Sequence, residues 1–124
     1  MLTTGVDIVE IQRIRQTVDR WGLRFLNRIY TEGELQYCKG RAESLAARFA
    51  AKEATMKALG TGTRGVSWRD VEVVRDPGKA PTLRLHASAS HRATTLGLHE
   101  LSLSISHSKQ YAIALVVGRM DNPL

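Results

Sequence analysis

Apolar and polar side chains alternate at the start of the chain, and the pattern then changes to a helical one. Over residues 3–11, TTGVDIVEI alternates in the way that predicts a strand. From residue 10 to about 21, apolar residues recur every three or four positions, which predicts a helix that Gly22 interrupts. The stretch 23–30, LRFLNRIY, then presents a second apolar helical face.

The longest predicted helix covers about residues 42–59. Before it, Thr31 and Glu34 form a T-x-x-E capping-box pattern, which predicts a short helix that begins there and ends at Gly40. Gly60 is well placed to end the long helix, because glycine adopts the left-handed conformation that terminates helices.

The second half of the chain is dominated by short alternating segments. A turn of composition DPGKAP separates the first two of them, and HSKQ connects the last two. Residues 86–98 are rich in alanine and weakly helical. Strands are expected at residues 70–76, 82–86, 101–106 and 111–118. The order predicts a single α+β domain over residues 1–124, with a mainly antiparallel sheet packed against one long helix and shorter helices.

Charge and composition narrow the class of protein. The 124 residues carry a formal charge of +6, which indicates an anionic partner such as nucleic acid, an acidic protein or a phosphorylated small molecule. No apolar run approaches the roughly 18 residues that span a bilayer, and the N-terminal residues do not resemble a signal peptide. Cys38 is the single cysteine, so an internal disulfide and a cysteine-based zinc site are excluded. We therefore expect a cytoplasmic protein without a membrane partner.

Glu53 and Lys57 stand out on the long helix, because they border its apolar stripe rather than lying opposite it. The small residues Ala46 and Ala50 occupy the same strip of helix surface, which leaves room for a close approach. One interpretation is a solvated Glu–Lys pair one turn apart. The other is a site in which Glu53 holds a hard cation and Lys57 neutralises phosphate. On the other side of the stripe lie Arg48 and Lys52.

Asp7 is the candidate second carboxylate. It interrupts an apolar strand, and a buried acid needs an ionic partner or a metal to offset its desolvation. A salt bridge to an arginine is the alternative interpretation. Asp7 and Glu53 together would supply the one or two carboxylates that magnesium takes alongside substrate phosphate and water.

Three motifs in register resemble those of holo-(acyl-carrier-protein) synthase, the short-chain type of 4′-phosphopantetheinyl transferase. They are GVDIVEI near the N-terminus, RFAAKEATMKA at 48–58 and SISHSKQYA at 104–112. Intermediate segments also fit, including the glycine-rich turn at 60–62 and WRDVEV at 68–73. The resemblance implies magnesium-dependent transfer of the phosphopantetheine arm of coenzyme A to a serine of apo-acyl carrier protein, with release of adenosine 3′,5′-bisphosphate.

The resemblance also implies roles for individual residues. Asp7 and Glu53 would be the magnesium ligands, and Glu53 and Lys57 would carry the catalysis, with Lys57 on the coenzyme A phosphates. The proton acceptor for the carrier serine stays open between a metal-bound water and Glu53. The coenzyme A pocket would include Arg48, Lys57, Gly60, Gly62, His107 and Ser108.

A basic stripe is expected in the first helical region. Arg13, Arg20, Arg24 and Arg28 would project within about 80° of one another if one helix ran through them. By resemblance, this stripe docks the acidic acyl carrier protein, and the protein is a homotrimer whose active sites lie at the subunit interfaces. The alternative function is a small basic nucleic-acid-binding module. It would use the same arginines on phosphates and would show a steep salt dependence on generic DNA or RNA.

Overall fold

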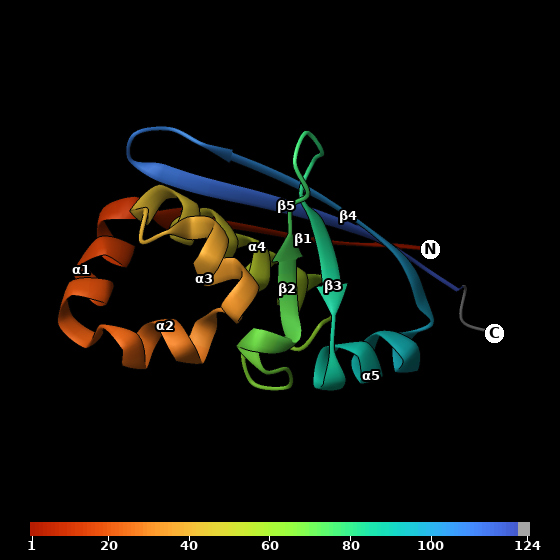
Figure 1. The fold of residues 1–124 in the computed structure, drawn as a ribbon. Helices are drawn as coiled ribbons and strands as arrows, with labels where there is room; N and C mark the ends of the chain where they lie inside the picture. The colour runs from red at the N-terminus through yellow and green to blue at the C-terminus, as the bar shows by residue number, and fades with distance from the viewer. Residues whose placement is uncertain (122–124) are drawn as a thin grey trace.

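The computed structural model, which describes residues 1–121, shows two antiparallel sheets arranged around one central helix (Figure 1). This agrees with the predicted α+β class. The elements in chain order are β1 (Leu2–Glu10), α1 (Ile11–Trp21), α2 (Leu23–Ile29), α3 (Glu32–Cys38), α4 (Ala42–Ala58), the 3₁₀ turn η1 (Trp68–Asp70), β2 (Val71–Val74), β3 (Thr82–Leu85), α5 (Ala87–Leu96), β4 (Leu98–His107) and β5 (Tyr111–Met120).

The larger sheet has the strand order β1-β5-β4, with all neighbours antiparallel. Strands β2 and β3 form a separate two-stranded sheet, so the expected antiparallel strands divide between two sheets. Helix α4 lies between the two sheets, because one cluster of buried residues joins its alanines to Val73 of β2 and to Ala114 and Val116 of β5 (Figure 1). The long helix is therefore the centre of the domain.

Small side chains let α4 approach the large sheet closely. A Cβ atom added to Gly5 of β1 would lie 1.9 Å from the carbonyl oxygen of Ala54, so only glycine fits at that position. Ala46 and Ala50 are fully buried within the core clusters that hold Ala112 and Ala114 of β5. The alanine strip expected to admit a ligand is instead filled by the strands of the large sheet, because backbone and small side chains pack there without a gap.

Most element boundaries fall close to the predicted ones. The capping box at Thr31 is formed in full, with both reciprocal hydrogen bonds, and α3 ends at Cys38, after which Lys39 and Gly40 both adopt positive φ angles. β4 begins at Leu98 rather than at residue 101, because an irregularity between Leu98 and Glu100 breaks the alternation from which the strand was predicted. Within residues 1–121, no helix has the length and apolar character that crossing a bilayer requires.

The large sheet leaves an apolar face uncovered on the side away from α4. Val6 and Ile8 of β1 are 51% and 60% exposed, and they pair directly with Leu115 and Ile113 of β5, which are 45% and 41% exposed. Asp7 points to the opposite side, toward α4, and its side chain is only 11% exposed. The strand therefore turns Asp7 toward the helix and presents Val6 and Ile8 outward.

Candidate functional site

Asp7, Glu53 and Lys57 converge where β1 packs against α4. The Lys57 ammonium donates a hydrogen bond of 2.9 Å to the carbonyl of Val6 and lies 3.3 Å from Oδ1 of Asp7. The Glu53 carboxyl lies beside Asp7, close enough for the two to share a hydrogen bond when Glu53 is protonated. Glu53 and Lys57 lie one turn apart on α4, so the helix places both beside the strand acid. The two carboxylates therefore lie close together at this point of the fold.

The environment of Glu53 changes the protonation of its carboxyl group. Burial, the hydrogen bond to Asp7 and repulsion from the Asp7 carboxylate together raise the pKa of Glu53 to about 7, while Lys57 acts in the opposite direction. Near neutral pH the Glu53 carboxyl is therefore protonated in part of the molecules. A divalent cation would relieve the same repulsion. No cluster of three or more histidine, cysteine or acidic side chains suited to a metal occurs in residues 1–121. A cation bound at this pair would therefore have two protein ligands, Asp7 and Glu53.

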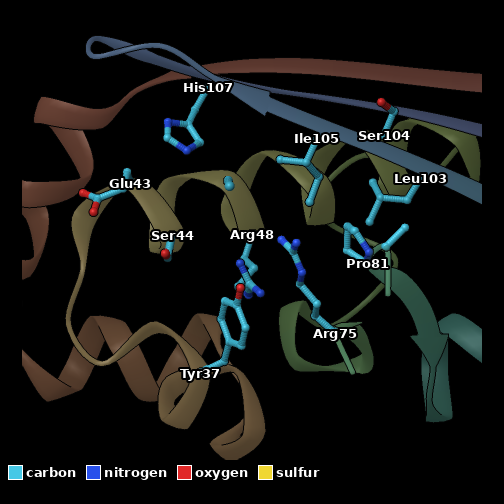
Figure 2. A pocket seen from close by; sticks show the side chains of 12 residues that line it. Tyr37, Glu43, Ser44, Arg48, Arg75, Pro81, Leu103, Ser104, Ile105 and His107 are labelled. Atoms are coloured by element: carbon cyan, nitrogen blue, oxygen red, sulfur yellow. The ribbon is translucent and has the colours of Figure 1, made fainter. Parts of the chain in front are cut away.

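A separate hollow of about 460 Å³ lies between α3, α4 and β4 (Figure 2). Arg48 of α4 is 5% exposed, and its guanidinium lies 4.0 Å from the centre of the Tyr37 ring. The Nε atom of Arg48 is buried without a hydrogen-bond partner. Arg75, which follows β2, and His107, at the end of β4, line the same hollow. An unpaired buried donor beside a second arginine favours an anionic ligand.

Arg48 and His107 were expected in a coenzyme A pocket, whereas Tyr37 and Arg75 were not. Arg75 follows an alternating strand and precedes a proline-glycine turn, which is a common context for a surface arginine. Tyr37 lies on the last turn of a short helix, and nothing in its spacing relates it to Arg48. Only the packing of α3 against α4 brings the two together.

The carboxylate pair and this hollow lie at opposite edges of the large sheet. Asp7 is on edge strand β1, whereas Leu103, Ile105 and His107 enter the hollow from the other edge strand, β4. β5 separates the two edges, which corresponds to two strand spacings, or about 10 Å. None of the three residues Asp7, Glu53 and Lys57 lines the hollow. Within one chain, the expected site residues therefore form two half-sites.

The remaining pocket candidates occupy turns. Gly60 and Gly62 follow α4 with φ angles of 74° and 58°, so both adopt the left-handed conformation. This turn begins three residues after Lys57. Ser108 shapes the β4–β5 turn, because its hydroxyl accepts the backbone N–H groups of Gln110 and Tyr111.

The predicted arginine stripe is divided in two. Gly22 has φ 55° and ψ −133°, which ends α1 and starts α2 in a new direction, so one helix does not run through the four positions. Arg24 and Arg28 of α2 line a hollow of about 350 Å³ together with Trp21. The guanidinium of Arg20 lies over the Trp21 ring at 5.1 Å. Arg13, on the other half of α1, does not line that hollow, although all four arginines are exposed.

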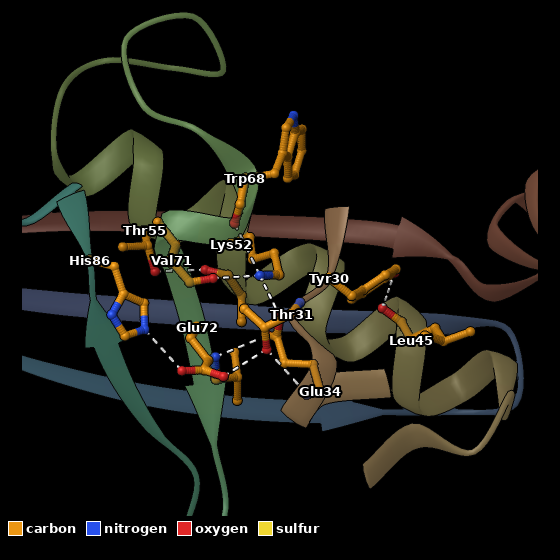
Figure 3. A network of polar contacts seen from close by, with 12 residues as sticks. Tyr30, Thr31, Glu34, Leu45, Lys52, Thr55, Trp68, Val71, Glu72 and His86 are labelled. Carbon is orange, nitrogen blue, oxygen red and sulfur yellow. Dashed lines mark hydrogen bonds and ion pairs between the residues drawn. The ribbon is translucent and has the colours of Figure 1, made fainter. Parts of the chain in front are cut away.

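Lys52 is a fully buried lysine that the sequence pattern placed at the edge of the apolar stripe. Its ammonium lies 2.7 Å from Oε1 of Glu34 and also donates to the carbonyls of Trp68 and Val71 (Figure 3). Both side chains of the ion pair have no exposed surface. Glu34 in turn accepts the N–H of Val73 at 3.0 Å. This network ties α3, α4 and β2 together and so fixes the walls of the hollow around Arg48.

Comparison with known proteins identifies the relatives of the chain. Residues 3–116 match the model of the 4′-phosphopantetheinyl transferase superfamily. A holo-[acyl-carrier-protein] synthase of Herpetosiphon aurantiacus is 53% identical, over 95% of this chain and 98% of that protein. A holo-[acyl-carrier-protein] synthase of Helicobacter pylori, crystallised in complex with coenzyme A, has 37% identity and a TM-score of 0.85, covering 94% and 99% of the two chains. A Chronobacterium ammoniagenes ACPS–CoA complex gives 30% identity and a TM-score of 0.87, over 98% and 99%.

Proposed function

The chain belongs to the 4′-phosphopantetheinyl transferase superfamily, and we propose that it is a holo-(acyl-carrier-protein) synthase. It transfers the 4′-phosphopantetheine arm of coenzyme A to a serine of apo-acyl carrier protein and releases adenosine 3′,5′-bisphosphate. The observation that carries this function is the convergence of Asp7, Glu53 and Lys57 beside one another. Similarity to holo-synthases over nearly the whole chain supports it. The proposed location is the cytoplasm.

We propose that Asp7 and Glu53 are the protein ligands of a magnesium ion. The donor set fits this ion, because magnesium takes one or two carboxylates and completes its shell with phosphate oxygens and water. Burial and the neighbouring Asp7 carboxylate raise the pKa of Glu53, and a cation between the two carboxylates would relieve the repulsion between them. When bound, magnesium would stabilise the charge that develops on the pyrophosphate during transfer.

The side chains around this pair would bind and orient coenzyme A. Lys57 is held by the Val6 carbonyl and Asp7, so its ammonium is fixed beside the pyrophosphate and neutralises a phosphate oxygen. Gly60 and Gly62 would let the backbone approach the phosphates closely. The hollow that holds Arg48, contributed by a neighbouring chain, would receive the nucleotide end, where the unpaired Nε of Arg48 would find an acceptor.

We propose a homotrimer in which each active site combines two chains. The two half-sites lie at opposite edges of the sheet, so a ring of copies would bring the carboxylate edge of one chain to the Arg48 edge of the next. The exposed apolar face formed by Val6, Ile8, Ile113 and Leu115 supports such an assembly, because a patch of this kind on a small domain needs covering. Ile113→Glu should therefore yield monomers in light scattering and lose transfer activity.

We propose that the exposed arginines of α1 and α2 dock the carrier protein. Arg13, Arg20, Arg24 and Arg28 supply positive charge for an acidic partner, and Trp21 adds an apolar contact at the hollow beside Arg24 and Arg28. Exposed charges of this kind mainly speed encounter and set orientation. Helix α1, which carries Arg13 and Arg20, begins directly after β1, the strand that carries Asp7.

The intact mass of an apo-acyl carrier protein, after incubation with the enzyme, coenzyme A and magnesium, tests this function. The wild-type chain should add one phosphopantetheine group, and Asp7→Asn and Glu53→Gln should abolish the addition. Asp76→Asn is the matched control, because Asp76 is an exposed acid in the β2–β3 turn. No mass gain with the wild-type chain, or an undiminished gain with both variants, would refute the proposed function.

A further inference from the structure

The C-terminus of α4 is held by an arginine from a different helix. Gly60 donates its N–H to the carbonyl of Lys57 at 3.0 Å, and Thr61 donates to Met56 at 3.1 Å, which together form a Schellman motif. The last carbonyl of this end, that of Leu59, accepts a 2.9 Å hydrogen bond from Nε of Arg92. Because Leu59 is fully buried, water does not replace that donor.

The same guanidinium also lies close to the turn that follows α4. Its Nη2 atom lies 3.4 Å from the position that a Cβ of Gly60 would occupy. Arg92 is partly buried, and no acidic side chain within residues 1–121 forms an ion pair with it. Its positive charge therefore acts on the helix end and on the Gly60 turn rather than on a carboxylate.

Helix α5, which carries Arg92, is itself firmly placed. Ala89 and Ala93 pack in one cluster with Met56 and Leu59 of α4. At the start of α5, the backbone N–H and the hydroxyl of Ser88 both donate to the carboxylate of Asp70. Arg92 thus reaches α4 from a rigid neighbour and not from a mobile loop.

We infer that Arg92 is a positioning residue for coenzyme A, acting through the last turn of α4. That turn carries Lys57, and the Gly60–Gly62 segment follows it directly, so both depend on how the helix ends. The end of a helix also carries a partial negative charge, which would repel an anionic substrate placed beside it. Arg92 offsets this charge from the protein side. The inference rests on the proposed function, since it concerns the substrate of that site.

Three substitutions separate the contributions of Arg92. Arg92→Lys keeps the charge, Arg92→Gln keeps a hydrogen-bond donor without charge, and Arg92→Met keeps only apolar bulk. His91→Gln is the matched control, because His91 is exposed on the same helix and its side chain has no hydrogen-bond or ionic partner in the described residues. For each variant we would measure KM for coenzyme A, KM for the carrier protein, binding of coenzyme A by calorimetry, and the melting temperature.

We expect Arg92→Met to raise KM and Kd for coenzyme A about five- to tenfold, the range typical of a charge at a partly buried helix end, with KM for the carrier unchanged. Arg92→Lys should restore most of the affinity, and Arg92→Gln should restore less. If Arg92 has a purely structural role, its variants should lower the melting temperature and either change both KM values together or change neither of them. Either of these results would overturn the inference. If Arg92→Met does not fold, the difference between Arg92→Lys and Arg92→Gln decides the question. Failure of the wild-type chain to transfer would instead refute the proposed function.

Discussion

Replacing the buried lysine of α4 should destabilise the protein more than almost any other single change. Lys52→Met keeps the length of the side chain but removes the ammonium, which has no exposed surface and lies 2.7 Å from Glu34. Burial lowers the pKa of Lys52, and the Glu34 carboxylate opposes that effect, so the pair is what keeps the lysine charged inside the protein.

The magnitude follows from what the substitution leaves behind. Glu34 would remain as a buried carboxylate without its cation, although it would still accept the N–H groups of Thr31 and Val73. Removing one partner of a buried ion pair typically costs about 3–5 kcal/mol. The carbonyls of Trp68 and Val71 would also lose a donor. Because the N–H groups of Thr31 and Val73 still bind Glu34, we expect Lys52→Met to lower the free energy of unfolding by about 3–4 kcal/mol, near the lower end of this range.

Denaturant unfolding at one fixed protein concentration measures this loss, since assembly would make stability depend on concentration. Glu34→Gln removes the opposite charge while keeping an acceptor for both N–H groups. The double variant Lys52→Met/Glu34→Gln should therefore be more stable than Lys52→Met alone, with a coupling of about 2 kcal/mol or more. A loss below about 1 kcal/mol for Lys52→Met, or a coupling near zero, would refute the reasoning.

Three further predictions concern other parts of the molecule. Burial raises the pKa of the Cys38 thiol to about 11, so between about pH 9 and pH 11 the folded state keeps a proton that the unfolded state has lost. The free energy of unfolding of the wild-type chain, relative to that of Cys38→Ala, should therefore fall by up to about 2.7 kcal/mol over this pH range. Denaturant unfolding at several pH values measures this difference, and a difference that stays constant with pH would contradict the prediction. Gly5→Ala should lower the free energy of unfolding by about 3 kcal/mol or more, because the new methyl group would overlap the carbonyl of Ala54. Denaturant unfolding measures this loss, and a near-neutral effect would show that β1 and α4 can move apart. Arg24→Glu should raise KM for the carrier protein far more than KM for coenzyme A, whereas Arg84→Glu, an exposed arginine on β3, should change neither; equal effects of Arg24→Glu on both substrates would argue against the proposed docking surface.

Local chemistry explains why several elements were predictable from the sequence. The capping box at Thr31 and the glycine stop at Gly60 depend on residues within one turn of the helix end, and both are formed as expected. The convergence of Asp7 and Glu53 was also anticipated, because an acid in an apolar strand and an acid beside a helical stripe each need a partner.

Tertiary packing decided the features that the sequence did not reveal. Lys52 belongs to the core because Glu34, eighteen positions earlier, reaches it from α3, and no periodicity within α4 indicates this. The alanine strip of α4 is covered by strands because Gly5 removes the side chain that would keep them apart. The stacking of Arg48 on Tyr37 likewise depends on how two helices meet.

Complementation between two inactive variants tests most directly whether each active site combines two chains. Asp7→Asn disables the carboxylate half-site and Arg48→Gln disables the hollow at the other edge of the sheet. Purified alone, each variant should leave the mass of the carrier protein unchanged. Co-expressed in equal amounts and isolated as mixed trimers, they should recover about one third of the wild-type rate, because a mixed ring of three chains joins two intact halves at one of its three sites. Mixed assemblies as inactive as the separate variants would contradict the account.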